Sequence, residues 1–248
     1  MLNAQLVAPR VLIFSSLVAA GCLDGAATLV REGNAAAHAG RLTEARGAFA
    51  KEVTARPGDV GARVLFAHVL TALHETQAAR AEYTSALERD PRCAEARLGL
   101  SRLALAETAP EAALELLAPL PVRDEARLLK ARALLARGRP GDGALVREAL
   151  GTSQSPEAAY LRGSALLVER HFAEAQATFE AVESASAPLA RYGLARVAAA
   201  QGRAADLLVH LRAARIALGP QWEPLAVAAD PAFDFVHDTP EFQPLLSK

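Results

Sequence analysis

Similar residues recur 34 positions apart in the first half of the sequence. The pairs are Ala45 and Ala79, Phe49 and Tyr83, and Pro57 and Pro91. A fixed period of this size indicates one supersecondary unit that is repeated and stacked on its neighbours. Alanine, the best helix former, supplies 58 of the 248 residues, whereas aromatic residues make up only 5%. The sequence therefore predicts an all-α protein and argues against a β-sandwich or barrel.

One segment carries the repeated pattern most fully, with the residues Gly33, Gly40, Ala45, Phe49 and Pro57. Small residues let two helix axes approach closely, and the aromatic side chain fills the gap between neighbouring hairpins. Proline ends the second helix, because it cannot donate the next backbone hydrogen bond. This pattern resembles the tetratricopeptide repeat. The resemblance implies a right-handed α-solenoid of about six helical hairpins whose first helices line a concave groove.

The same register can be laid along residues 26–219. It predicts hairpins that begin near Ala26, Val60, Ala94, Asp124, Pro156 and Pro188. The small residue at which the two helices cross is then Gly33, Ala67, Ser101, Ala131, Gly163 or Ala195. The third, fourth and sixth hairpins are degenerate, because the aromatic position holds Leu117, Arg147 and Leu211. If the array bends or opens anywhere, we expect this at the glycine-rich turn 138–143.

The last part of the chain, residues 220–248, is richer in proline, aspartate and aromatic residues than the repeats. A solenoid needs an atypical terminal unit to cover the apolar face of its last repeat. We therefore expect a C-terminal cap here. Its predicted core-facing residues are Trp222, Phe233, Phe235, Phe242 and Leu246.

The N-terminal residues 1–21 have the layout of a signal peptide, with Arg10 before an apolar run at 11–20. The segment that ends at Cys22 resembles a bacterial lipobox, which implies a lipidated Cys22 and attachment to a membrane. Leu23 after that cysteine favours an outer-membrane lipoprotein that faces the periplasm. A soluble periplasmic protein, or a cytoplasmic one with an uncleaved N-terminus, are the alternatives. Lipidation would leave Cys93 without a disulfide partner.

The sequence contains no arrangement that indicates catalysis or a cofactor. His74-Glu75 begins like a zinc-protease motif, but Ala78 stands where the second histidine ligand should be, so no metal site is predicted. The 27 basic and 28 acidic residues give a net charge of -1, and a nucleic-acid-binding protein usually has a basic excess. We therefore expect a non-enzymatic protein that does not bind nucleic acid.

The family resemblance places the partner-binding groove on Asn34, His68, Arg102, Arg132, Tyr160, Tyr192 and Arg196. The three arginines share the ninth register position, and they could bind acidic groups of a peptide while the tyrosines supply apolar area. Alternatively, arginine is simply abundant and this position is solvated. The predicted function is a membrane-tethered scaffold that binds a protein or peptide partner and assists assembly of an envelope complex. The alternative is a soluble regulatory or chaperone-like adaptor.

Overall fold

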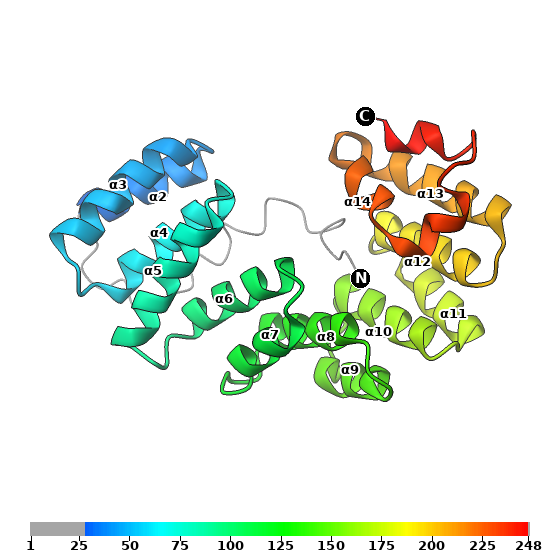
Figure 1. Cartoon of the computed structure of the whole chain (residues 1–248), viewed down its shortest axis with the longest axis horizontal. Coiled ribbons are helices and arrows are strands. Elements are labelled where there is room, and N and C mark those ends of the chain that lie inside the picture. Colours follow the sequence, from blue (N-terminus) through cyan, green and yellow to red (C-terminus); the bar gives the residue numbers. More distant parts are fainter. Residues whose placement is uncertain (1–27, 248) are drawn as a thin grey trace. The chain divides into compact units, whose positions relative to one another are not determined.

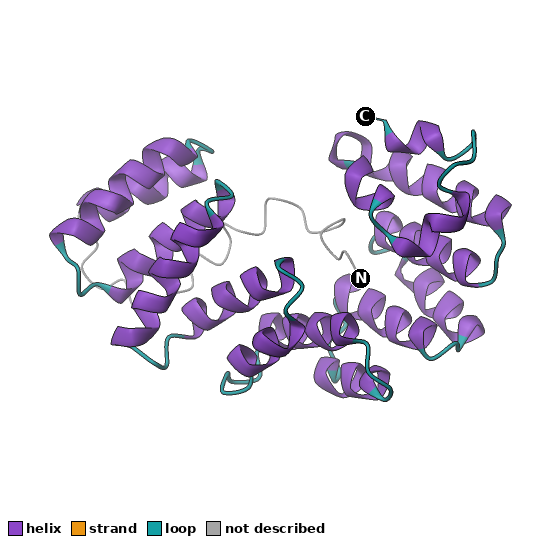
Figure 2. Ribbon diagram, in the orientation of Figure 1, coloured by secondary structure: helices purple, strands orange, loops and turns teal. Residues whose placement is uncertain are grey.

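A computed structural model describes residues 28–247, apart from the side chains at positions 28, 225 and 226. Every regular element in this range is an α-helix or a short 3-10 helix, and the range contains no strand (Figure 2). The prediction of an all-α protein is confirmed. The chain divides into two compact units between Leu120 and Pro121, within the proline-containing segment 118–121.

The first unit consists of three antiparallel helical hairpins, which are coloured blue to green in Figure 1. Each hairpin joins a first helix to a second helix through a short turn. The pairs are α2 (Thr28–His38) with α3 (Leu42–Ala55), α4 (Val60–Ala72) with α5 (Thr76–Arg89), and α6 (Ala94–Ala106) with α7 (Pro110–Leu117).

The second unit also has three hairpins, followed by a C-terminal cap (Figure 1). The hairpins are α8 (Asp124–Arg137) with α9 (Asp142–Leu150), α10 (Pro156–Val168) with α11 (Phe172–Val182), and α12 (Ala187–Ala200) with α13 (Ala204–Leu218). The cap consists of η3 (Gly219–Gln221), α14 (Pro224–Ala228), η4 (Pro231–Val236) and η5 (Gln243–Leu246).

Five first helices begin at or next to the residues that the sequence register predicts, and the predicted start near Ala26 lies outside the described residues. Helices α4, α6, α8 and α10 start at the predicted residues, and α12 starts one residue early, at Ala187. Local capping explains two of these starts. The side chain of Asp59 accepts a hydrogen bond from the Ala62 amide at 2.9 Å, and Ser155 accepts one from the Ala158 amide at 3.1 Å.

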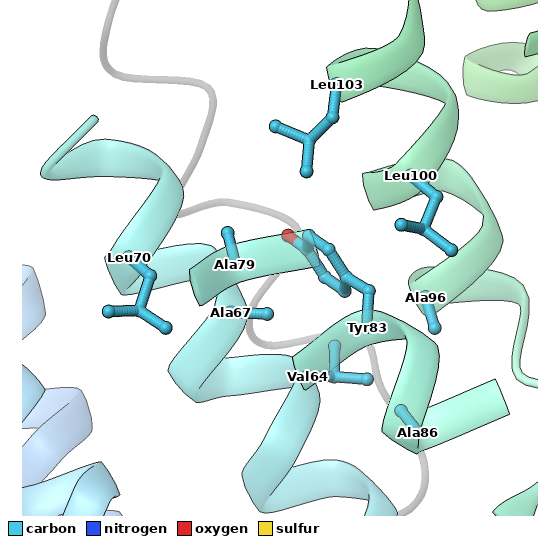
Figure 3. Close-up of a cluster of buried hydrophobic side chains, with 9 residues drawn as sticks. All are labelled: Val64, Ala67, Leu70, Ala79, Tyr83, Ala86, Ala96, Leu100 and Leu103. Atoms are coloured by element: carbon cyan, nitrogen blue, oxygen red, sulfur yellow. The ribbon is translucent and has the colours of Figure 1, made fainter. Parts of the chain in front are cut away.

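Aromatic side chains of the second helices pack directly on glycines of the first helices. A β-carbon on Gly33 would lie 2.7 Å from Phe49 Cζ, and one on Gly99 would lie 2.5 Å from Tyr83 Cε1. Figure 3 shows Tyr83 among the small and aliphatic side chains of α4, α5 and α6. Glycine is required here for close approach, because any larger residue would collide with the ring.

Phe179 on α11 contacts glycines of two successive hairpins. A β-carbon on Gly163 of its own hairpin would lie 2.6 Å from Phe179 Cε1, and one on Gly193 of the next hairpin would lie 2.5 Å from Phe179 Cγ. The predicted small crossing residues are also buried, and four of them are fully inaccessible: Ala67, Ser101, Ala131 and Ala195. The interpretation of the repeat as a packing pattern is therefore confirmed at these positions.

Ion pairs join successive hairpins on the outer surface. Arg46 on α3 pairs with Glu75 before α5, and Arg80 on α5 pairs with Glu107 after α6. Arg147 makes the same kind of pair with Glu169 in the second unit. Many of the abundant arginines are thus already paired within the chain. Such exposed pairs contribute about 0–1 kcal/mol each.

The turn between α8 and α9 is tied down, contrary to the expectation that this is where the array would open. The carboxylate of Asp142 is buried. It accepts hydrogen bonds from Arg137 Nε at 3.0 Å, from Arg137 Nη2, and from the Arg139 amide at 2.8 Å. The hydrogen bond from Arg137 holds the pKa of Asp142 below its usual value. The chain instead divides at Leu120. A carboxylate with three hydrogen bonds offsets the flexibility that glycine brings to this turn.

The cap packs on α12 and α13. Its buried residues differ from the predicted core at two positions. Trp222, Phe233 and Phe242 are buried as expected. Phe235, however, is 50% exposed, and Leu245 takes the buried place that was assigned to Leu246. The 3-10 geometry explains both, because residues three apart share a face. Phe233 therefore points inward with Val236, and Phe242 with Leu245.

Candidate functional site

The candidate site is the ninth register position of the first helices. In the described residues this position holds Asn34 on α2, His68 on α4, Arg102 on α6, Arg132 on α8, Ser164 on α10 and Arg196 on α12. Five of these six residues belong to the predicted groove. The other two predicted residues, Tyr160 and Tyr192, lie one helical turn earlier on α10 and α12. The predicted lipidation site, Cys22, lies outside the described residues.

Buried polar atoms without a hydrogen-bond partner gather at this position. Among the described residues there are seven such side-chain atoms, and five of them are at the ninth position. These five are Asn34 Oδ1, His68 Nδ1, Arg132 Nε, Ser164 Oγ and Arg196 Nε. Buried polar groups in proteins are normally hydrogen-bonded, so exceptions that recur at one register position within each unit need an explanation other than packing.

In the first unit, His68 is a neutral, buried imidazole. The residue is 9% exposed, and its ring lies edge-on to the Tyr83 ring, with a centroid distance of 5.6 Å. Burial, and to a smaller degree the charge of Arg102, lower the pKa of His68 to about 4. His68 is therefore uncharged at neutral pH, and its Nδ1 has no hydrogen-bond partner.

Arg102 and Asn34 are the other predicted residues of this unit, and both are partly buried. The charge of Arg102 acts on His68 and on Tyr83. Arg102 also interacts with other groups of the chain. The side chains of α4 and α6 are thus electrostatically coupled at the ninth position. No described group of three His, Cys, Asp or Glu residues is placed to hold a metal ion.

In the second unit, Arg132 is engaged by a carboxylate of the next first helix. Its guanidinium donates to Glu157 at the start of α10, and both side chains are partly exposed. Arg132 therefore does not present an uncompensated positive charge for an acidic peptide. Glu157 is not among the residues predicted from the sequence, where its only signal is an acidic residue directly after Pro156 at a helix start.

The two tyrosines lie inside the second unit, so they do not supply the apolar area that the prediction assigned to them. Tyr160 is 6% exposed and packs against Phe179, with a centroid distance of 5.6 Å. Tyr192 is 4% exposed, and its hydroxyl donates a hydrogen bond to Asp230 Oδ2 at 2.6 Å. Position five thus faces neighbouring helices and the cap rather than solvent.

Arg196 is held beside the same carboxylate. Its side chain is 13% exposed, and its Nε lies 3.5 Å from Asp230 Oδ2. Burial lowers the pKa of Arg196, but Tyr160, Asp230 and Tyr192 outweigh this effect and raise it. Burial and the negative charge of Asp230 raise the pKa of Tyr192. Tyr192 and Arg196 therefore keep their protons. Asp230 accepts a hydrogen bond from the neutral Tyr192 hydroxyl and lies beside the Arg196 cation.

These contacts decide what the surface can do chemically. The described ninth-position residues are two neutral groups and one arginine in the first unit, and a serine and two paired arginines in the second. Two carboxylates, Glu157 and Asp230, compensate the second-unit arginines. The sequence prediction missed both, because pairing across hairpins depends on how the helices pack. The arrangement suits hydrogen bonding to a polypeptide, and no described residue pair forms an acid-base or nucleophile arrangement here.

Comparison with known proteins agrees with this architecture. No curated protein matches the sequence. A tetratricopeptide repeat protein from Parabacteroides merdae is 16% identical and has a TM-score of 0.61, with 88% of this chain and 96% of that one covered. The pilF protein of Pseudomonas aeruginosa is 18% identical and has a TM-score of 0.55, with 77% and 90% covered. YrrB, described as a TPR protein with an unusual peptide-binding site, is 22% identical and has a TM-score of 0.49, with 73% and 96% covered.

The family itself is shown by sequence. The family described as "Tetratricopeptide repeat" matches residues 13–60, 64–120 and 160–221, which together make up more than half of the chain. The matched ranges include all or most of the first three hairpins and the last two. The chain therefore belongs to the tetratricopeptide repeat family.

Proposed function

We propose that this chain is a non-enzymatic scaffold that binds a protein or peptide partner on its first helices. Tetratricopeptide repeat proteins serve as protein-protein interaction scaffolds. One observation supports a particular binding surface. Most of the described buried polar atoms that lack a hydrogen-bond partner lie at the ninth position of the first helices. Packing alone favours apolar side chains at such places, so the recurrence of polar side chains there in each unit supports a binding role.

The binding surface can be tested with two matched arginine substitutions. Arg102→Ala changes the ninth position of a first helix, whereas Arg80→Ala removes the same charge from the outer helix α5. Proteins captured by the tagged full chain from its native host are compared by quantitative mass spectrometry. We expect Arg102→Ala to reduce capture at least fivefold and Arg80→Ala to leave it unchanged. Equal capture by both variants would place the partner elsewhere.

We further propose that the scaffold is tethered to a membrane through Cys22 and assists assembly of an envelope complex. The support is the apolar run 11–20 followed by small residues and Cys22. An outer-membrane lipoprotein that faces the periplasm is the proposed location. Among the described residues, no helix combines the length and hydropathy needed to cross a bilayer. Labelled palmitate should enter the wild-type chain and not Cys22→Ala; an unlabelled wild type would refute the anchor.

A soluble regulatory or chaperone-like adaptor is the second candidate. One observation favours it: the first match to the repeat family begins at residue 13, within the segment proposed as a signal peptide. Fractionation of the native host separates the two candidates. An adaptor keeps residues 1–21 and stays in the soluble fraction, whereas the lipoprotein loses them and sediments with membranes.

A further inference from the structure

The C-terminal cap places an acidic and an aromatic residue against α12, the first helix of the last hairpin. Asp230 accepts the Tyr192 hydroxyl at 2.6 Å and lies 3.5 Å from Arg196 Nε. Tyr192 is at register position five and Arg196 at position nine of α12. Position nine is the one that the proposed function assigns to a partner, and Tyr192 lies one helical turn before it, so here the chain's own segment takes the place of a partner.

The aromatic ring of the segment is the second anchor. Phe233 is 1% exposed and meets the Tyr192 ring edge-on, with a centroid distance of 5.6 Å and an angle of 86° between the rings. Asp230 also accepts the Ala232 amide at 3.0 Å, which fixes the turn between the two anchors. A carboxylate followed three residues later by a phenylalanine is thus matched by a cation, a hydroxyl and an aromatic ring.

We propose that Tyr192 and Arg196 form a recognition site for a segment of the type Asp-Pro-x-Phe, which residues 230–233 occupy in cis and which a partner can occupy in trans. This inference rests on the proposed function and adds the chemistry of the partner. The site is nearly dry, and Asp230 itself is 3% exposed. A carboxylate that binds a cation there is worth more than at an exposed surface, so loss of its charge should weaken binding at least tenfold.

The test empties the site in the full chain and offers the segment as a separate molecule. The variant Asp230→Ala/Phe233→Ala removes both anchors. The probe is a fluorescein-labelled peptide with the sequence of residues 228–238, and a second peptide carries Asn in place of Asp230. Binding is measured by fluorescence anisotropy. Phe235→Ala is the matched control, because Phe235 lies on η4 but is half exposed and leaves both anchors in place.

We expect the doubly substituted chain to bind the Asp peptide at least tenfold more tightly than the Asn peptide. Wild type and Phe235→Ala, whose sites are occupied in cis, should bind the Asp peptide at least tenfold more weakly than the double variant. Adding Arg196→Gln to the double variant should abolish binding. If the double variant loses helical circular dichroism, Asp230→Ala alone is used. It leaves Phe233 in place but frees Tyr192 and Arg196 from their carboxylate, and it should still bind the Asp peptide at least tenfold more tightly than the Asn peptide.

Two results would overturn the inference: no binding of the Asp peptide at about 1 mM, or equal binding of the Asp and Asn peptides. Neither result touches the proposed scaffold function, which is measured separately by partner capture with Arg102→Ala. Equal capture by Arg102→Ala and Arg80→Ala would count against the scaffold surface and leave the peptide result standing.

Discussion

Phe179 offers a direct test of the packing that holds successive hairpins together. The change is Gly193→Ala, which adds one methyl group to the face of α12 that meets α11. The new β-carbon would lie 2.5 Å from Phe179 Cγ and Cε1, whereas carbon atoms in contact are about 3.5–4.0 Å apart. The ring must therefore move by about 1 Å or more.

The ring has little room to move. Phe179 is fully buried, and Gly163 packs against the same side of the ring, where a β-carbon would lie 2.6 Å from Phe179 Cε1. Overpacking of this kind costs about 1–3 kcal/mol, and we place this site at the upper end. Alanine recovers about 1 kcal/mol through its higher helix propensity. The net loss in free energy of unfolding should be about 2 kcal/mol.

The assay is urea unfolding followed by circular dichroism, with Gly47→Ala as the control. Gly47 is an exposed helical glycine, and apart from its chain neighbours and the backbone of its own helix no atom lies within 4 Å of the place that an added methyl group would take. Its replacement should therefore stabilise the chain by up to about 1 kcal/mol. Introducing Phe179→Leu together with Gly193→Ala should cost less than the sum of the single changes. If Gly193→Ala were as stable as wild type, the close packing of Phe179 on Gly193 would not limit the size of residue 193.

Three further predictions concern buried groups. The pKa of His68 falls from 6.5 to about 4 on folding. The contribution of neutral His68 to the free energy of unfolding should therefore be complete above pH 6.5 and decline by up to about 3 kcal/mol as the pH falls to 4. Urea midpoints measured across this range should show the decline, and His68→Gln should flatten the curve. Asp142 has a lowered pKa, so its contribution should be present above pH 4 and be lost as pH falls through the folded-state value; Asp142→Ala should cost about 2 kcal/mol at pH 7 in the same assay. Phe233→Ala should lower stability by about 3–5 kcal/mol and Phe235→Ala by less than about 1, measured by the fluorescence of Trp222, the single tryptophan of the chain.

The fold could be predicted largely from the sequence because its signals are local. Asp59 and Ser155 cap the helices they precede, and Pro156 starts α10, so the beginnings of α4 and α10 follow from short stretches of sequence. The period of 34 sets the register of the first three hairpins, and intervals of 30 to 32 residues between small crossing residues extend it to the others. Small residues at the crossing position are buried for the reason that the pattern implies.

The candidate site could be predicted only in part. The register placed the ninth position correctly on the first helices, but the partners of its side chains come from elsewhere in the chain. Asp230 lies 34 residues beyond Arg196, and no local pattern pairs them. The exposure of Phe235 was missed for a related reason, because the cap folds as a 3-10 helix and not as an α-helix.

The position of Phe179 between two glycines limits how this array can change by recombination. Its ring needs Gly163 in its own hairpin and Gly193 in the following one, and Tyr83 similarly needs Gly99 in the hairpin after it. A hairpin copied or moved to a new place would pack against a neighbour whose glycine does not face its aromatic ring. The hairpins are therefore not interchangeable modules, and a duplication that inserts a side chain opposite Phe179 would have to be followed by a compensating loss of that side chain.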